Sequence, residues 1–462
     1  MIRALAAYLP TRMLLLGATE ALLVGLAFTG AILFRFGHDA DLVLRYEHGL
    51  IKIALVIAVF FLSMWYLDLY DGQFLSRHFQ LLPRLLQVAG VMVILLAFVY
   101  YAYPGAQIGR SVLLVGMFLA LILLVSWRQM FFTFIRQLNL VQRVLVFGTG
   151  PFAVALSKEA STRPELGVDF VGCIDDLEPR YPTKTLPYMG KPTLLREVVR
   201  NNRVSRVIVA LEDRRGRLPL EQLLQLKCEG IVVEEGFDFY ESVTGKVPLD
   251  SLRMSWLVFS QGFRPSRVQL CTRRAISFCV AVVGLTCSLP LMLIAALAVR
   301  IDSEGPIIFP QHRVGKDGTI FTIYKFRTMR LDLDLDGGSR PAQKVDSRVT
   351  RVGRWLRRTR IDELPQLYNV VRGDMDLVGP RPFVPPQEAE FVKKIPFYRH
   401  RWAVKPGATG WAQVNRGYCA TFEDNVEKLA YDLFYIKHMS VGLDLIILLQ
   451  TIKIILLGRG GQ

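Results

Sequence analysis

Four long apolar segments open the chain, at residues 13–34, 53–67, 85–103 and 111–127. Glu20, in the first of them, is the only charged residue that the four segments contain. A helix that spans a bilayer needs about 20 such residues, within a range of roughly 17–25. The pattern therefore predicts four transmembrane helices over residues 1–138. The simplest role for this region is a membrane anchor.

Basic residues mark the two ends of this region. Arginines precede the first apolar segment, and Arg128 and Arg143 follow the fourth. Because four crossings return the chain to the side on which it started, these flanks place both ends in the cytoplasm. Arg35, Arg45 and Lys52 in the first outer loop weaken this charge bias.

After residue 142 the pattern changes to short β-branched runs that alternate with helical patterns. The stretch "RVLVFGTGPFAVAL" (residues 143–156) predicts a strand, a glycine-rich turn and a helix, and Gly148, Gly150 and Ala153 fit the dinucleotide fingerprint G-x-G-x-x-A. The runs "FVGCIDD", "RVIVAL" and "GIVVEE" predict further strands. This alternation predicts a parallel sheet in a Rossmann-like α/β domain over residues 139–262.

The glycine fingerprint alone does not establish a bound nucleotide. A Rossmann-like scaffold without a cofactor is the preferred interpretation, and Gly148 and Gly150 are kept as a candidate nucleotide turn. A rival function, a membrane-tethered nucleotide-sugar dehydratase or epimerase, needs a Tyr-x-x-x-Lys pair for proton transfer. The sequence contains no such pair.

A fifth apolar run, residues 275–299, has no charged residue and is long enough to cross a bilayer. Pro290 lies inside it, and an internal proline interrupts the backbone hydrogen bonds and kinks a helix. Both flanks are basic, with Arg273 and Arg274 before the run and Arg300 after it. These features favour a bent, re-entrant helix with both flanks in the cytoplasm. A proline-kinked full span is the alternative.

Two later segments have patterns that suit a membrane surface. The stretch "RVTRVGRWLRRTR" (residues 348–360) spaces arginines at intervals of three beside Val352, Trp355 and Leu356, and it contains no acid. On a helix this gives a basic stripe beside an apolar stripe, which suits lipid headgroups; a solvated charged face is the alternative. Residues 441–457 are mostly apolar and predict another interfacial helix, or a buried one.

Composition narrows the class of protein. Of the 462 residues, 52% are hydrophobic and 21% are charged, and the mean hydropathy of +0.32 fits a chain that lies partly in the membrane and partly in water. The net charge of +16 suits an anionic partner, and the membrane segments favour lipid and phosphate over nucleic acid. The six cysteines lack CxxC spacing, which argues against disulfides and a zinc site. The sequence shows no signal-peptide cleavage pattern, so we do not expect an N-terminal signal peptide to be removed.

The stretch "RTRIDELPQLYNVVRGDMDLVGPRP" (residues 358–382) places two adjacent acids, Asp362 and Glu363, directly after a run of arginines. A structural interpretation makes Asp362 a helix N-cap, with Pro365 in the first turn. A functional interpretation is phosphoryl transfer, because an ionised carboxylate can attack phosphorus when Mg²⁺ and arginines neutralise the phosphate oxygens. We expect the dipole of the following helix to keep this carboxylate ionised.

Several stretches, taken together, resemble the bacterial sugar transferase family, the monotopic phosphoglycosyl transferases. Besides the acidic pair and its surroundings, they are "CSLPLMLIAAL" (287–297), "IIFPQHRVGKDGTIFTIYKFRTM" (307–329) and "KPGATGWAQVN" (405–415). They match in order and spacing from residue 267 onward. The resemblance implies an α+β catalytic domain over residues 263–462, and the preceding membrane and Rossmann-like regions resemble the larger members of the family.

The resemblance also implies a reaction and a location. Such enzymes transfer a sugar-1-phosphate from a UDP-sugar to undecaprenyl phosphate and release UMP; UDP-glucose and UDP-galactose are the first candidate donors here. They work on the cytoplasmic face of the bacterial cytoplasmic (inner) membrane and start exopolysaccharide or O-antigen synthesis. Mg²⁺ is the expected cofactor, membrane lipid is an expected partner, and a homodimer is left open. A non-catalytic assembly or regulatory protein is the remaining rival.

Individual residues can be matched to the family pattern. Asp362 resembles the nucleophile, which forms a covalent aspartyl-phosphosugar intermediate, and Glu363 resembles its partner; both are expected to hold Mg²⁺. The positive groups expected around the donor diphosphate are Lys325, Arg327, Arg357 and Arg381. Pro290 resembles the helix-breaking proline, although Leu289 stands where some members have serine.

Overall fold

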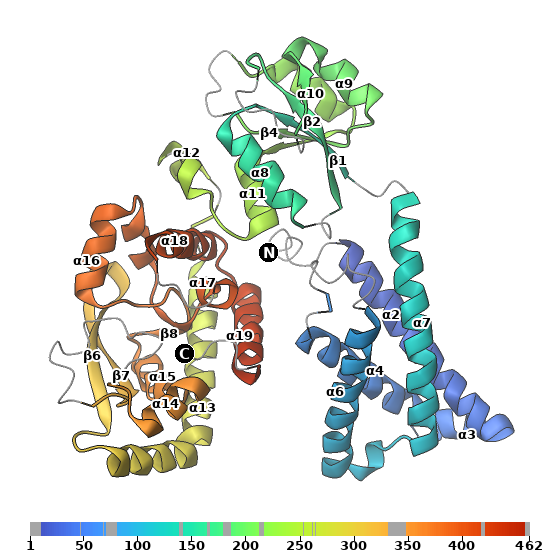
Figure 1. Ribbon diagram of the computed structural model, residues 1–462, viewed down its shortest axis with the longest axis vertical. Helices are drawn as coiled ribbons and strands as arrows, with labels where there is room; N and C mark the ends of the chain where they lie inside the picture. Colours follow the sequence, from blue (N-terminus) through green and yellow to red (C-terminus); the bar gives the residue numbers. More distant parts are fainter. Residues whose placement is uncertain are drawn as a thin grey trace. The chain divides into compact units, whose positions relative to one another are not determined.

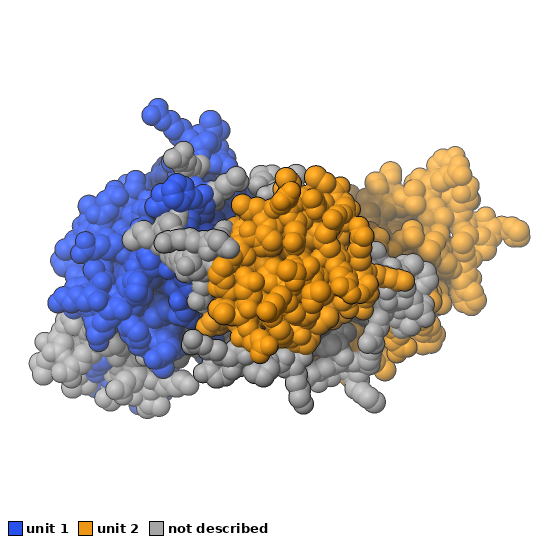
Figure 2. Space-filling view, turned by 90° about the horizontal axis from the view of Figure 1, so that it is seen from above, with its two compact units in different colours: residues 1–5, 245–462 blue, residues 6–244 orange. Residues whose placement is uncertain are grey.

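The chain forms two compact units (Figure 2), of which unit 1 contains Gly245–Gln462 and unit 2 contains Ala6–Thr244. The computed structural model describes residues 11–457 apart from 47, 68, 71–80, 138–141, 164–166, 179–185, 212–216, 253, 261, 264, 331–347 and 417–420.

The first part of unit 2 is helical. Its long helices are α2 (Thr11–Phe36), α4 (Gly49–Tyr66), α6 (Leu81–Ala102) and α7 (Arg110–Gln137) (Figure 1). The short elements between them are η1 (Gly37–Asp39), α3 (Ala40–Arg45) and η3 (Pro104–Ala106). Each long helix contains a segment that is long and apolar enough to cross a membrane. The prediction that the N-terminal region is built from several long apolar helices is confirmed.

A close contact between a glycine and a phenylalanine ring, together with one buried ion pair, joins α2 to α7. Gly116 of α7 lies so close to the Phe28 ring of α2 that a Cβ atom there would come within 2.8 Å of the ring. Close approach over glycine is a common way for membrane helices to pack. The buried Glu20 of α2 accepts a hydrogen bond from Arg128 Nε of α7 at 2.5 Å and another from the Tyr70 hydroxyl at 2.6 Å.

The second part of unit 2 is a five-stranded sheet in the order β3-β2-β1-β4-β5, with every neighbouring pair parallel. The strands are β1 (Gln142–Phe147), β2 (Val168–Ile174), β3 (Tyr188–Gly190), β4 (Arg206–Val209) and β5 (Val232–Glu235). The connecting helices are α8 (Pro151–Ser161), η5 (Pro192–Leu194), α9 (Leu195–Asn201), α10 (Leu220–Cys228) and α11 (Gly236–Thr244).

Two separate apolar cores cover the two faces of this sheet. Val144 and Val146 of β1 face the core that contains α8 and α11, whereas Leu145 and Phe147 face the core that contains α9 and α10. Alternate residues of one strand therefore enter opposite cores, as expected for a parallel sheet that is buried on both sides. The predicted parallel α/β sheet is confirmed.

Unit 1 combines helices with two small sheets. Before its longest helix come η6 (Leu249–Ser251) and α12 (Met254–Phe259). The sheets pair β6 (Ile308–Val314) with β7 (Ile320–Phe326) antiparallel, through η7 (Lys316–Gly318), and β8 (Asp376–Val378) with β9 (Gly407–Thr409) parallel. The elements after β7 are α14 (Arg351–Thr359), η8 (Ile361–Glu363), α15 (Gln366–Arg372), α16 (Pro385–Lys394), η9 (Tyr398–Ala403), α17 (Trp411–Asn415), α18 (Phe422–Lys437) and α19 (Val441–Leu456).

The segment that enters unit 1 from the sheet domain packs on the helices near the C-terminus. Trp411 Nε1 donates to the Gly245 carbonyl at 2.8 Å, Lys246 pairs with Glu427 at 3.1 Å, and the Val247 amide donates to the Ala430 carbonyl. Residues 245–247 are therefore held by α17 and α18.

Helix α13 (Arg267–Asp302) is the longest helix of unit 1 and contains Pro290. Ser266 begins it with a reciprocal capping box to Gln269. Its ribbon changes direction along its length (Figure 1), as an internal proline favours. It is long and apolar enough to cross a membrane, and many of its large apolar side chains are exposed, among them Leu289, Leu293, Ile294 and Leu297.

The two surface segments predicted from their patterns are helical. The arginine spacing had suggested that Arg348 lies on α14. Thr350 caps this helix, so Arg348 instead lies before it. Trp355 of α14 is exposed. Helix α19 buries Leu443 and Ile447 and exposes Leu445, Leu449 and Ile452. It is therefore not the fully buried helix of the second alternative, and its interfacial position stays a prediction.

We predict that Glu20→Ala destabilises unit 2 by about 3–5 kcal/mol, because the change leaves the buried Arg128 without its carboxylate. Thermal unfolding of the purified protein in detergent measures the effect. Asp41→Ala is the control, because its pair with Arg45 is exposed and pairs of that kind contribute little. Equal unfolding temperatures for the two variants would show that the buried pair is not a major contact.

Candidate active site

A left-handed turn delivers the acidic pair to the interior of unit 1. Arg360 ends α14 with a φ of +60° and leads directly into η8, which carries Asp362 and Glu363. A positive φ is uncommon outside glycine and often marks a functional site. Ile361 anchors the turn, because it is buried in one apolar cluster with Val299 of α13 and Leu356 of α14.

Three cations contact the Glu363 carboxylate. Arg381 donates to Oε1 at 2.8 Å and Lys325 to Oε1 at 3.1 Å, while Arg360 approaches Oε2 at 3.4 Å. Burial alone would raise the pKa of Glu363, but Arg381, Lys325 and Arg360 together hold it well below its usual range. Glu363 is therefore ionised at neutral pH and holds the cations around it in place.

Asp362 lies in a different environment from its neighbour. It is buried and accepts no hydrogen bond or ion pair within the described part of the chain. Burial, followed by the charge of Glu363, raises its pKa to about 6, although Lys325, Arg357 and Arg360 act in the opposite direction. Among the residues that the structure describes, none forms a hydrogen bond or ion pair with its oxygens.

One expectation for Asp362 differs from the structure. It is not a helix N-cap, since Pro365 occupies that position of α15 and Asp362 lies within η8. The carboxylate was also expected to be ionised. Burial and the charge of Glu363 raise its pKa to about 6, a value at which the carboxylate is still mostly ionised at pH 7.

The four predicted positive residues do not all lie in one place. Lys325 and Arg381 contact Glu363 directly. Arg357 is near enough to act on the charge of Asp362, and its Nε donates to Thr328 Oγ1 at 2.8 Å. Arg327 instead donates to the Ser303 carbonyl at 2.6 Å and to its hydroxyl at 2.9 Å, at the end of α13. The structure thus brings Arg327 to the helix end, whereas the other three surround the acidic pair.

Buried Asn369 joins the helix after the acidic pair to the strand that carries Lys325. Its Oδ1 accepts from the Tyr324 amide at 3.1 Å, and its Nδ2 donates to the Thr322 carbonyl at 2.7 Å. The side-chain amide thereby replaces a strand partner along β7. This contact holds α15 against β7, the strand that carries Lys325. The sequence alone gave no signal for it.

Arg313 of β6 is a second residue that the sequence did not single out. Its NH1 donates to the Pro382 carbonyl at 3.0 Å. Burial, and then the charge of Arg381, lowers its pKa to about 10. A cation whose pKa is lowered by another cation indicates crowded positive charge, which an anionic ligand would relieve. The only sequence signal for Arg313 was its place in the stretch 307–329, which resembles the sugar transferase family.

The residues available for a metal ion are the acidic pair itself. No cluster of three or more His, Cys, Asp or Glu side chains occurs in the described ranges. Mg²⁺ usually takes only one or two carboxylates, together with waters and substrate phosphates. The Asp362 carboxylate beside the ionised Glu363 fits this donor set, and the surrounding cations would attract a phosphate as the additional ligand.

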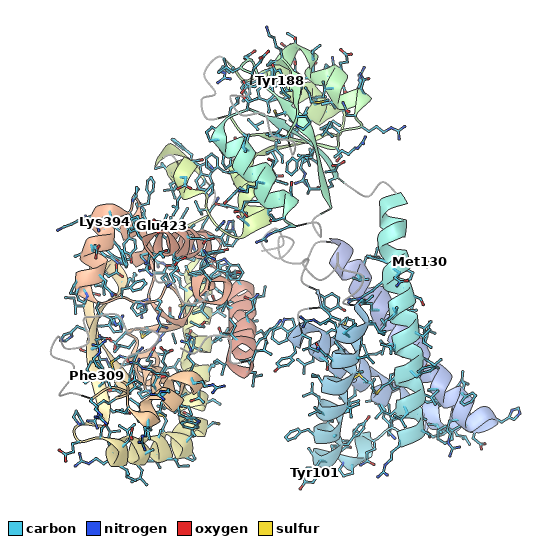
Figure 3. The ribbon with its side chains drawn as sticks, viewed as in Figure 1. Tyr101, Met130, Tyr188, Phe309, Lys394 and Glu423 are labelled. Atoms are coloured by element: carbon cyan, nitrogen blue, oxygen red, sulfur yellow. The ribbon has the colours of Figure 1, made fainter. Side chains whose placement is uncertain are left out.

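The glycine-rich turn of the sheet domain has a structural explanation. Gly148 has a φ of +130°, and a Cβ there would lie 2.7 Å from the Ala210 carbonyl oxygen. Asp175, at the end of β2, accepts from the Thr149 amide at 3.0 Å, from the Thr149 hydroxyl and from Arg217. Tyr188, labelled in Figure 3, donates to the Asp175 backbone carbonyl at 3.0 Å. In dinucleotide-binding domains an acid at this strand end binds a ribose hydroxyl, whereas here protein donors occupy it.

Gly150, the other residue of the candidate turn, has an extended backbone and precedes Pro151, which begins α8. Proline lacks the N–H group that a helix start can offer to a phosphate.

Comparisons with known proteins match both units. The model of a family described as bacterial sugar transferase matches residues 268–458, and one described as a CoA-binding domain matches residues 66–223. The UDP-glucose:undecaprenyl-phosphate glucose-1-phosphate transferase of Xanthomonas campestris pv. campestris is 33% identical over 384 residues, which cover 79% of this chain and 78% of the relative. A protein of the same name from Escherichia coli (strain K12) is 33% identical over 308 residues, 64% of each chain.

A third relative is matched over a shorter part. The UDP-N-acetylgalactosamine-undecaprenyl-phosphate N-acetylgalactosaminephosphotransferase of Aeromonas hydrophila is 42% identical over 222 residues, 48% of this chain. The match spans about half of that relative's length, 52%.

The family match includes η8 with its acidic pair, the β6–β7 hairpin and the segment that carries Arg381. The Xanthomonas relative extends the likeness over more than three quarters of both chains. The chain belongs to the bacterial sugar transferase family.

Proposed function

We propose that this protein transfers a sugar-1-phosphate from a UDP-sugar to undecaprenyl phosphate and releases UMP. The observation that carries the proposal is the buried, uncommitted Asp362 carboxylate beside Glu363 and its three cations. The Xanthomonas and Escherichia relatives are named for a glucose donor and the Aeromonas relative for an N-acetylgalactosamine donor. UDP-glucose is therefore the first donor to test, followed by UDP-galactose and UDP-N-acetylgalactosamine.

In the first half-reaction an oxygen of Asp362 attacks the β-phosphorus of the UDP-sugar. A bond forms between that oxygen and phosphorus, the bond from phosphorus to the bridging oxygen breaks, and UMP leaves with the electron pair. The product on the enzyme is an aspartyl-phosphosugar. Lys325, Arg357 and Arg381 bind and orient the diphosphate and oppose its negative charge. When bound to Asp362 and Glu363, Mg²⁺ would neutralise further charge on the phosphate oxygens.

In the second half-reaction a phosphate oxygen of undecaprenyl phosphate attacks the same phosphorus. The acyl-phosphate bond breaks, and Asp362 recovers its carboxylate. The products are undecaprenyl-diphospho-sugar and free enzyme. Glu363 keeps its charge throughout, because its cations hold its pKa low, and it therefore fixes the position of Arg381 and Lys325 in both steps.

The membrane arrangement that fits this chemistry has four spanning helices, α2, α4, α6 and α7, in the bacterial cytoplasmic (inner) membrane. Helix α13 bends around Pro290 and enters and leaves on the cytoplasmic side. The lipid acceptor has its phosphate at headgroup level, and the donor arrives from the cytosol, so a site on a re-entrant helix meets both. The exposed apolar side chains of α13 support this placement. The product would start exopolysaccharide or O-antigen synthesis.

The proposed division of labour has three regions. Residues 1–138 anchor the chain, residues 139–262 form the Rossmann-like domain, and residues 263–462 perform the transfer. The satisfied Asp175 carboxylate favours a scaffold role for the sheet domain over dinucleotide chemistry.

We predict that Asp362→Asn abolishes both the lipid-linked product and the covalent phosphosugar adduct, because an amide is a poor nucleophile of nearly the same shape. Incubation of the purified protein with each UDP-sugar and undecaprenyl phosphate, with UMP release and intact-protein mass as readouts, measures this. Asp317→Asn, at an exposed turn of the same unit, is the matched control and should keep parental turnover. Normal turnover by Asp362→Asn would exclude the nucleophile assignment.

Removal of divalent metal should stop UMP release, and added Mg²⁺ should restore it, because a carboxylate attacking a diphosphate needs its charge neutralised. An independent readout is the rise in unfolding temperature that Mg²⁺ with UMP produces by mass action in the parent. This rise should be absent in Asp362→Asn. Full activity in excess chelator would contradict the metal requirement.

Single cysteines in a cysteine-free background should show that both flanks of α13 lie on one side. We expect positions near Arg267 and near Gly315 to be protected from an impermeant thiol reagent in whole cells and to react after lysis. Pro290→Leu restores the missing backbone donor and should favour a straight span. Labelling of the Gly315 position from outside in the parent would refute the re-entrant arrangement.

A further inference from the structure

Arg381 lies on an irregular segment whose backbone is held at each of four successive carbonyls. The segment is residues 379–383, "GPRPF". The Pro380 carbonyl accepts from the Gly407 amide, and the Phe383 carbonyl accepts from the Val314 amide. Between them, the Arg381 carbonyl accepts from Arg401 NH2 at 2.9 Å, and the Pro382 carbonyl accepts from Arg313 at 3.0 Å.

Side chains are needed here because the segment cannot hold itself in place. Pro380 and Pro382 lack backbone N–H groups, so the segment offers few donors for a regular strand. Two of the four successive carbonyls, those of Arg381 and Pro382, are bound by arginine side chains from other parts of the sequence. A backbone fixed at consecutive carbonyls has little freedom, and the direction of the Arg381 side chain is fixed with it.

Arg401 is itself held rigidly. It is only 4% exposed and pairs with Glu388 at 3.1 Å and Asp432 at 2.9 Å, from α16 and α18. Its guanidinium also lies 5.0 Å from the centre of the Phe383 ring, at the end of the same segment. The two carboxylates orient the planar fork so that the NH2 group that pairs with Asp432 also reaches the Arg381 carbonyl.

We infer that Arg401 is a positioning residue for sugar-phosphate transfer: it fixes the backbone at Arg381 so that the Arg381 guanidinium meets Glu363 and the donor diphosphate. The inference rests on the proposed function for its kinetic part only. The path runs from Asp432 and Glu388 through Arg401 to the Arg381 backbone. From there the Arg381 side chain reaches Glu363 Oε1 at 2.8 Å.

The test compares Arg401→Lys with Trp402→Phe. Lysine keeps the buried charge but has one compact ammonium group, which cannot serve Glu388, Asp432 and the Arg381 carbonyl together. Trp402→Phe removes the bond from Trp402 Nε1 to Glu388 at 3.2 Å together with part of the ring that packs near Gly318, and it leaves the direct contacts of Arg401 in place. It is therefore the matched control for general disturbance of the same buried network.

The first readout does not depend on activity. Hydrogen exchange of a peptide covering residues 376–384 should be faster in Arg401→Lys than in the parent, and Trp402→Phe should match the parent. Unchanged exchange in Arg401→Lys would overturn the inference, whatever the enzyme does. Faster exchange in both variants would also overturn it, because the effect would then belong to the network as a whole.

The second readout is a double-mutant cycle on UMP release. Arg401→Lys should lower kcat/KM for the UDP-sugar roughly 10–100-fold in the parent, since small displacements of a catalytic group have effects of this size. In an Arg381→Ala background the same change should have almost no further effect, because the guanidinium that it positions is gone. Equal losses in both backgrounds would overturn the inference. Parental kinetics for Arg381→Ala would instead contradict the proposed function, and the exchange result would stand separately.

Discussion

The Glu363 carboxylate is the contact on which the arrangement of unit 1 around the candidate site depends. It joins Lys325 of β7, Arg360 at the end of α14 and Arg381 of the irregular segment before α16. Without this half-buried anion the cations, together with Arg313, would repel one another in a poorly solvated place. One carboxylate compensates only part of their charge, and the remainder suits a diphosphate. The neighbouring Asp362 is left uncommitted for chemistry.

Helix α13 connects this charge cluster with the apolar surface of unit 1. Arg274, in its first half, donates to the Val370 carbonyl at 2.7 Å and to the Val371 carbonyl at 3.1 Å, the last turn of α15. Val299, in its second half, packs with Ile361 beside the acidic pair. The same helix therefore supports the residues before and after Asp362, while its outer face exposes apolar side chains. The proposed reaction between a lipid phosphate and a soluble nucleotide would use this combination.

The sheet domain shows how a sequence motif acquires its meaning from its neighbours. The Gly148 turn was visible in the sequence as a candidate nucleotide turn, and the run "FVGCIDD", which contains Asp175, was visible as a strand. In the structure Gly148 permits close approach of the Ala210 carbonyl, and Asp175 is bound by Thr149 and Arg217. A glycine fingerprint indicates a backbone geometry, and the same geometry is compatible with close packing as well as with phosphate binding.

The sequence by itself determined the apolar helices, the parallel sheet and the pairing of Asp362 with Glu363, because segment length, residue periodicity and adjacency are local properties. Only the tertiary structure decided which cations face the pair. Lys325 lies within β7, whereas Arg327 follows the last residue of that strand, so strand alternation does not fix its direction, and it meets Ser303. Asn369 and Arg401 gave no local signal, because each acts by donating to carbonyls that chain folding alone brings near. The raised pKa of Asp362 has the same origin, since burial is a property of the packed unit.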